Sequence, residues 1–60
     1  MRNMSIKALE NIVAENEVFA NIVEEASARG EFAGGYANGK AGEYYEARNE
    51  LKRRGVKVGD

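Results

Sequence analysis

Residues 5–29 of the chain read SIKALENIVAENEVFANIVEEASAR, a stretch without glycine or proline. Within it, apolar residues recur at steps of three and four, the spacing that places side chains on one face of an α-helix. That stripe consists of Leu9, Ile12, Phe19, Val23 and Ala26, with Asn16 in the remaining register position. Asn3 or Ser5 can cap the start of the helix, and Gly30 suits its end. The stretch therefore predicts one long helix over residues 5–29.

Two interpretations of Asn16 stay open, because a buried amide without a hydrogen-bond partner is costly. In the first, the helix is continuous and Asn16 faces its counterpart in a paired helix, where it fixes the register. In the second, the helix breaks near Glu15, and Asn16 caps a new helix that starts at Glu17. The continuous helix is favoured because neither glycine nor proline marks a turn there. Val18 and Ile22 lie off the stripe, which a second contact surface or a broken helix would explain.

Residues 30–42 contain five of the seven glycines in the chain. Glycine has little preference for regular structure, so we expect a loop that Phe32 and Tyr36 hold against the helices. An alternative is a β-hairpin with its turn at Asn38 and Gly39, a pair typical of two-residue turns. The other glycines weaken that alternative, because they make poor strand residues.

A second helix is predicted over residues 43–54, which are mostly strong helix formers and end in the cations Lys52, Arg53 and Arg54. Its apolar face is thin, so it must dock on the first helix to persist. We therefore expect residues 1–60 to form a single all-α domain, a helical hairpin, with two copies paired into a four-helix bundle. A broken first helix followed by the β-hairpin would instead give a small winged helix-turn-helix-like α+β fold.

The composition excludes most catalytic chemistry. The 60 residues include no cysteine and no histidine, which removes disulfides, zinc fingers, and Cys or His nucleophiles and bases. Ser5 and Ser27 have no such base to activate them. Glu24 and Glu25 are adjacent, so on a helix their side chains point about 100° apart. We therefore expect a protein that is not an enzyme and that uses neither a cofactor nor a metal.

The small size of the chain makes its fold marginal. A domain of 60 residues buries only about 60% of the surface that its unfolded chain exposes. Association is the simplest further source of burial when disulfides are absent. We expect self-association or partner binding through five residues of the stripe: Leu9, Ile12, Asn16, Phe19 and Val23. No apolar run approaches about 18 residues and no secretory leader is evident, so we expect a cytoplasmic protein without a membrane partner.

The net charge of −1 conceals an asymmetry, because residues 1–31 carry a net charge of −3 and residues 32–60 one of +2. The spacing from Gly34 to Lys40 matches a phosphate-binding loop, but Ala41 stands where that motif needs Ser or Thr. A weaker anion site stays open, and basic residues interleaved with tyrosines can bind single-stranded nucleic acid. The residues of this alternative site are Gly39, Lys40, Arg48, Lys52, Arg53 and Arg54.

These observations favour a small non-enzymatic helical interaction protein that self-associates as a homodimer and binds a protein partner. Within this class, we expect a viral protein, namely a regulator or inhibitor of the phage type. Acidic residues on the outer face of the first helix would suit a basic partner surface. The alternative function is binding of a phosphate-bearing ligand, a nucleotide or a nucleic acid through the glycine-rich loop and the basic end of the second helix.

Overall fold

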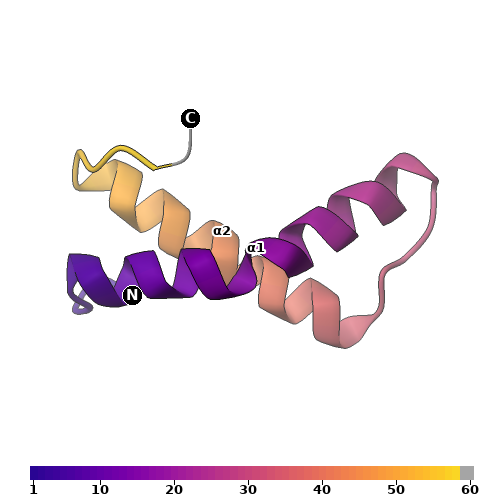
Figure 1. Ribbon diagram of the computed structural model, residues 1–60, viewed down its shortest axis with the longest axis horizontal. Helices are drawn as coiled ribbons and strands as arrows, with labels where there is room; N and C mark the ends of the chain where they lie inside the picture. The colour runs from indigo at the N-terminus through magenta and orange to yellow at the C-terminus, as the bar shows by residue number, and fades with distance from the viewer. Residues whose placement is uncertain (59–60) are drawn as a thin grey trace.

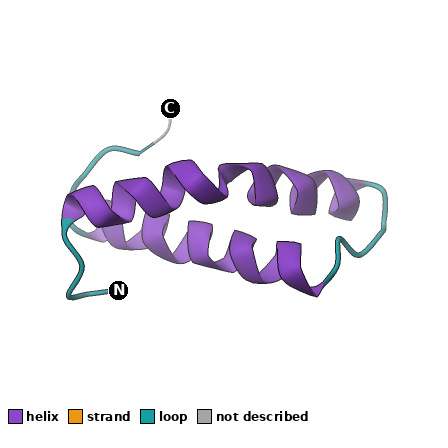
Figure 2. Ribbon diagram, turned by 60° about the horizontal axis from the view of Figure 1, so that its bottom comes forward, coloured by secondary structure: helices purple, strands orange, loops and turns teal. Residues whose placement is uncertain are grey.

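The computed structural model describes residues 1–58, which form a hairpin of two α-helices and contain no β-strand. Helix α1 spans Ile6–Ala28 and helix α2 spans Gly35–Arg53. The helices run in opposite directions and lie side by side, joined by residues 29–34 at one end (Figures 1 and 2). The prediction of an all-α helical hairpin is therefore confirmed.

Helix α1 is continuous, as the apolar stripe predicts. Ser5 caps its start, because the Ser5 Oγ accepts a hydrogen bond from the Ala8 N–H at 3.1 Å. The helix stops at Arg29, and Gly30 follows with a φ of 72°, the left-handed conformation that glycine adopts easily. No break occurs at Asn16, so the alternative in which Asn16 caps a new helix is wrong.

Helix α2 begins at Gly35 rather than at residue 43, so the prediction of a loop over residues 30–42 is wrong for its second part. Residues 35–42 are helical, which also excludes the β-hairpin and the winged α+β fold. The chain turns at Gly34, whose φ is 103°. The Asn38 backbone N–H and the Asn38 Nδ2 then donate to the Gly34 carbonyl at 3.0 and 2.9 Å. Docking against α1 outweighs the low helix propensity of the glycines.

The core between the helices consists of two clusters. The first lies toward the chain ends and contains Leu9, Ala47 and Leu51. The second lies nearer the loop and contains Ala20, Ala41 and Tyr44. Leu9 and Leu51 are the largest side chains that the described part of the chain buries completely. Most of the other buried apolar positions are alanines, so the hairpin has a thin core.

The N-terminal residues and the end of α2 lie together at the end of the hairpin that is remote from the loop (Figure 1). The Arg54 guanidinium donates to the Arg2 carbonyl at 2.8 Å and to Glu50 at 2.8 Å. Val56 and Val58 pack against the first core cluster. Neither helix in the described part of the chain is long and apolar enough to cross a membrane.

Candidate interaction surface

The five residues predicted to mediate self-association are distributed unevenly between the interior and the surface. Leu9 and Asn16 are 0% and 6% exposed within one chain, whereas Ile12, Phe19 and Val23 are half-buried. Leu9 packs against Ala47 and Leu51 of α2. The stripe therefore contributes to contacts between the two helices of the hairpin, and only its half-buried members keep surface that a partner can cover.

The amide of Asn16 is satisfied inside its own helix. Its Nδ2 donates to the Ile12 carbonyl at 2.9 Å, four residues earlier in α1. A side chain that bonds to its own helix needs no counterpart in a second copy. Asn16 therefore does not depend on a hydrogen bond to a second copy, which is the contact that would fix the register of a paired helix.

Large apolar side chains are exposed around the loop end of the hairpin. Val18 and Ile22 on α1 are 56% and 42% exposed, and Phe32 and Tyr36 are 77% and 71% exposed. Most of the buried residues at this end are alanines, namely Ala20, Ala26 and Ala41, and the one large buried side chain in the same core cluster is Tyr44. In the loop half, several large apolar groups are therefore exposed, while apart from Tyr44 the buried residues are small.

Aromatic contacts join the two helices on this surface. The rings of Phe19 and Tyr36 meet edge to face, with their centroids 5.5 Å apart and an interplanar angle of 82°. The Lys40 ammonium lies 5.8 Å from the centroid of the Tyr36 ring. Ile22 is one turn along α1 from both Val18 and Phe19. We call Val18, Phe19, Ile22 and Tyr36 the loop-side face.

A hollow on α2 borders the loop-side face. It has a volume of about 280 Å³ and is lined by Gly35, Tyr36, Gly39, Lys40 and Glu43. Apart from the adjacent backbone of α2, no heavy atom lies within 4 Å of the position that a Cβ would take on Gly35 or Gly39. The hollow is therefore open above two residues that have no side chain.

The side chain of Tyr45 forms a further bond between the helices. Its hydroxyl donates to the Glu24 carboxylate, and this hydrogen bond raises the pKa of Tyr45 above its usual value of 10.0. The bond uses a carboxylate that would otherwise face solvent. It holds α2 in register with the second half of α1.

The cations of the predicted phosphate or nucleic-acid site are separated along α2. Gly39 and Lys40 lie inside the helix, whose free N–H groups begin at Gly35 instead. Lys40 and Arg53 are thirteen positions apart in the sequence, which corresponds to about 20 Å along a helix. The structure therefore does not bring the two parts of this site together.

The cations near the end of α2 are engaged with neighbouring side chains. Arg53 and Arg54 both bind the Glu50 carboxylate, and these hydrogen bonds lower the pKa of Glu50 to about 2. The Arg48 Nη1 donates to the Tyr44 hydroxyl at 3.1 Å, and its guanidinium lies over that ring. Lys52 is exposed. These arginines already stabilise the hairpin, which reduces what they can offer to a phosphate.

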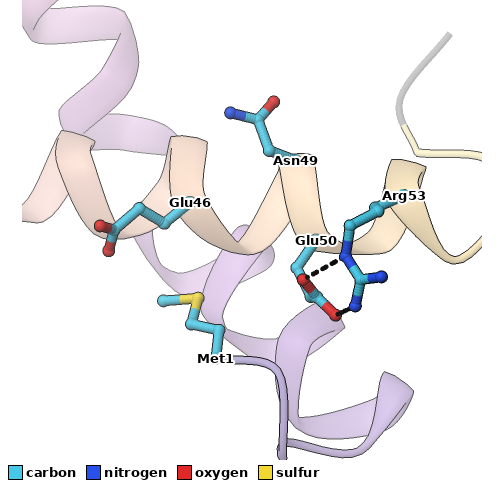
Figure 3. A pocket seen from close by; sticks show the side chains of 5 residues that line it. All are labelled: Met1, Glu46, Asn49, Glu50 and Arg53. Atoms are coloured by element: carbon cyan, nitrogen blue, oxygen red, sulfur yellow. Dashed lines mark hydrogen bonds and ion pairs between the residues drawn. The ribbon is translucent and has the colours of Figure 1, made fainter.

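A second cavity, of about 340 Å³, opens beside the N-terminus (Figure 3). Its lining residues are Met1, Glu46, Asn49, Glu50 and Arg53. Figure 3 shows the Glu50 carboxylate turned onto the Arg53 guanidinium rather than into the cavity. Among residues 1–58, no cluster of acidic, histidine or cysteine side chains has the arrangement that a metal ion needs. Of the two carboxylates that line the cavity, that of Glu50 is therefore already paired with a cation.

Comparison of the chain with protein-family models, with curated proteins and with solved structures finds no match. The fold and the surface define a class of protein by their geometry: a two-helix hairpin with an exposed apolar face at its loop end.

Sequence reasoning only partly identified the loop-side face. Phe19 belongs to the predicted stripe, and Val18 and Ile22 stood out because they lie off it. Tyr36 was expected to anchor a loop, yet it lies in the first turn of α2 and is mostly exposed. The missing signal was the start of α2, because only that start brings Tyr36 and the hollow onto the same side as Phe19.

Proposed function

We propose that this chain is a small non-enzymatic helical interaction protein that self-associates and binds a protein partner. The observation that supports the proposal is the loop half of the hairpin, where alanines form most of the interior and several large apolar side chains are exposed. Exposed apolar surface of this kind marks interaction sites in soluble proteins. Among possible roles, a regulator or inhibitor of the phage type suits a chain without catalytic groups.

The shape of the hairpin leaves surface for association. Its accessible surface is 4159 Å², close to the roughly 3,900 Å² that a folded monomer of this mass exposes. The hairpin is also elongated, with extents of 34 × 22 × 15 Å. Covering part of this surface with another protein chain would add burial that the thin core does not provide.

The charge of α1 suits a basic partner protein. Glu10, Glu17 and Glu25 are exposed on the helix and have no ion pair among residues 1–58. Opposite charge on a partner would speed association and favour that partner over acidic ones. This acidic surface and the loop-side face together would allow the chain to self-associate and to bind a second protein.

Sedimentation equilibrium tests self-association directly. Over about 1 to 300 µM protein, we expect the mean mass to rise above the 6.6 kDa of one chain. Circular dichroism on the same samples checks that the helices persist. A chain that stays at the monomer mass and remains helical throughout this range would contradict the proposal.

A labelled oligonucleotide tests the alternative function. Nucleic-acid binding through phosphate contacts would weaken steeply between about 50 and 200 mM salt. Our proposal predicts no change in fluorescence anisotropy at either salt concentration. Salt-sensitive binding that is lost in a Lys40→Ala or Lys52→Ala variant would favour the alternative instead.

A further inference from the structure

We infer that a second copy of this chain covers the loop-side face and docks α1 of each copy on α2 of the other. The inference rests on the proposed function, because it names the surface through which self-association occurs. Two neighbouring features of one chain carry it: apolar side chains that project from α1, and the hollow on α2.

The projecting side chains are Val18 and Ile22. They lie one turn apart on α1 and are 56% and 42% exposed. Both are β-branched, so each has one strongly preferred conformation in a helix and loses little freedom when it is covered. Phe19 lies beside them and holds the Tyr36 ring by an edge-to-face contact. The projection is therefore rigid and continuous with α2.

The hollow offers space for such a projection. Gly35 and Gly39 form part of its lining, and apart from the adjacent backbone of α2 no heavy atom lies within 4 Å of where their Cβ atoms would be. Glycine on a helix surface lets another helix approach closely, because no side chain keeps the backbones apart. An aliphatic side chain from a second molecule can therefore enter the hollow between Tyr36 and Lys40.

Symmetry identifies the occupant. The projection and the hollow belong to the same chain and meet where Phe19 contacts Tyr36. A two-fold rotation that lays α1 of one copy on α2 of the other fills both hollows with the same pair of side chains. A second copy therefore supplies both the projecting side chains and the hollow that receives them.

The available area fits a dimer. A stable interface buries about 800 Å² on each partner, roughly one fifth of the 4159 Å² that this chain exposes. The broad side of the hairpin measures 34 by 22 Å, which is sufficient for a contact of that size. Two hairpins lying broadside over the loop-side face would form four helices around a shared apolar centre.

The first experiment fills the hollow. Gly39→Leu places a side chain on its floor, and Gly42→Leu makes the same change on the same helix outside its lining. Both substitutions raise helix propensity. In sedimentation equilibrium, we expect Gly39→Leu to weaken self-association at least about tenfold and Gly42→Leu to leave it within about twofold. Equal effects of the two substitutions, or tighter association of Gly39→Leu, would overturn the inference.

The second experiment changes the projection. Ile22→Gln and Ile6→Gln alter the same residue type on the same helix at nearly equal exposure, 42% and 44%. Ile6 lies in the first turn of α1, far from the loop. We expect Ile22→Gln to weaken self-association about tenfold, while Ile6→Gln has little effect. If Ile6→Gln proves as disruptive as Ile22→Gln, the copies meet elsewhere and the inference is wrong.

The two proposals fail in different ways. If the wild-type chain is helical and monomeric up to about 300 µM, self-association fails, and the inference fails with it. If the wild type associates but neither Gly39→Leu nor Ile22→Gln weakens it, only the inference fails. Circular dichroism identifies a variant that does not fold, and Gly39→Leu then decides the question, because it raises helix propensity and removes no side chain from the core.

Discussion

The structure changes the interpretation of Asn16, because it shows the hydrogen-bond partner of the side chain. On the sequence, an amide in an apolar stripe indicates either a seam between copies or a helix cap. In the structure, it is 6% exposed and donates to the carbonyl of Ile12 in its own helix. The Ile12 carbonyl also accepts the Asn16 backbone N–H as part of α1, so the side-chain bond is an addition rather than a requirement.

We therefore predict that Asn16→Leu stabilises the hairpin by about 1 kcal/mol, because leucine has higher helix propensity and no buried polar group. Urea unfolding followed by circular dichroism at one fixed protein concentration measures the change. Asn21→Leu is the matched control, since Asn21 is exposed on the same helix. It should gain only the propensity difference, about 0.5 kcal/mol. A loss of stability in Asn16→Leu would mean that the amide is needed where it lies.

Glu50 links the stability of the fold to pH. Its pKa is lowered from 4.5 to about 2 by hydrogen bonds from Arg53 and Arg54. A lowered carboxyl pKa in the folded state contributes stability above the unfolded value, and this contribution is lost as the pH falls toward the folded value. We predict that the urea midpoint falls as the pH is lowered from about 4.5 to 2 and that Glu50→Gln reduces this fall. The control Glu46→Gln should retain the full fall of the urea midpoint, because Glu46 lies on the same helix but has no ion pair among residues 1–58.

At the scale of the helices, α1 could be predicted from its sequence and the start of α2 could not. Helix α1 has a regular apolar stripe, a serine cap and a terminating glycine, which all indicate the same boundaries. The first turns of α2 contain Gly35, Gly39 and Gly42, and local propensity alone predicts a loop there. What makes these turns helical is tertiary contact, chiefly Ala41 in the second core cluster and Tyr36 against Phe19.

Because residue 42 is helical, Gly42→Ala should stabilise the hairpin by up to about 1 kcal/mol. Gly34→Ala should have the opposite effect, because Gly34 has a φ of 103°, which a residue with a Cβ adopts only under strain. Thermal unfolding of both variants by circular dichroism measures the two effects. A gain in both variants would be typical of a flexible segment, as the glycine-rich loop was predicted to be, and would contradict the observed start of α2.

Sequence patterns alone also identified only part of the interaction surface. Side chains on α1 could be placed by helical periodicity, so Phe19, Val18 and Ile22 were recognisable as apolar groups on or off the stripe. The hollow could not be found, because it requires Gly35 and Gly39 to lie one turn apart on a helix. Periodicity also does not show which apolar face α2 covers, and it therefore assigned to self-association two residues that the hairpin buries, Leu9 and Asn16.

At the scale of the whole molecule, the hairpin has two unequal halves. The half near the chain ends has leucines in its core and is closed by Val56, Val58 and the bonds of Arg54. The half near the loop has a core of alanines and Tyr44 and no buried leucine. Regions with few buried apolar contacts open more easily than the rest of a protein.

Amide hydrogen exchange should show this difference. In dilute solution, we expect faster exchange in residues 20–28 and 36–42 than in residues 9–16 and 45–52. At concentrations where the chain self-associates, the loop half should gain protection, because the second copy covers it. Protection gained mainly near the chain ends would indicate a different interface.

The bonds from Arg54 to the Met1 and Arg2 carbonyls hold the N-terminal residues beside the end of α2. A peptide tag, a dye or a solid support joined at residue 1 would therefore emerge on the side of the molecule opposite the connecting segment. Immobilising the chain in this way would leave Phe32 and Tyr36 pointing away from the support, so surface-based capture can sample that region without steric interference from the attachment.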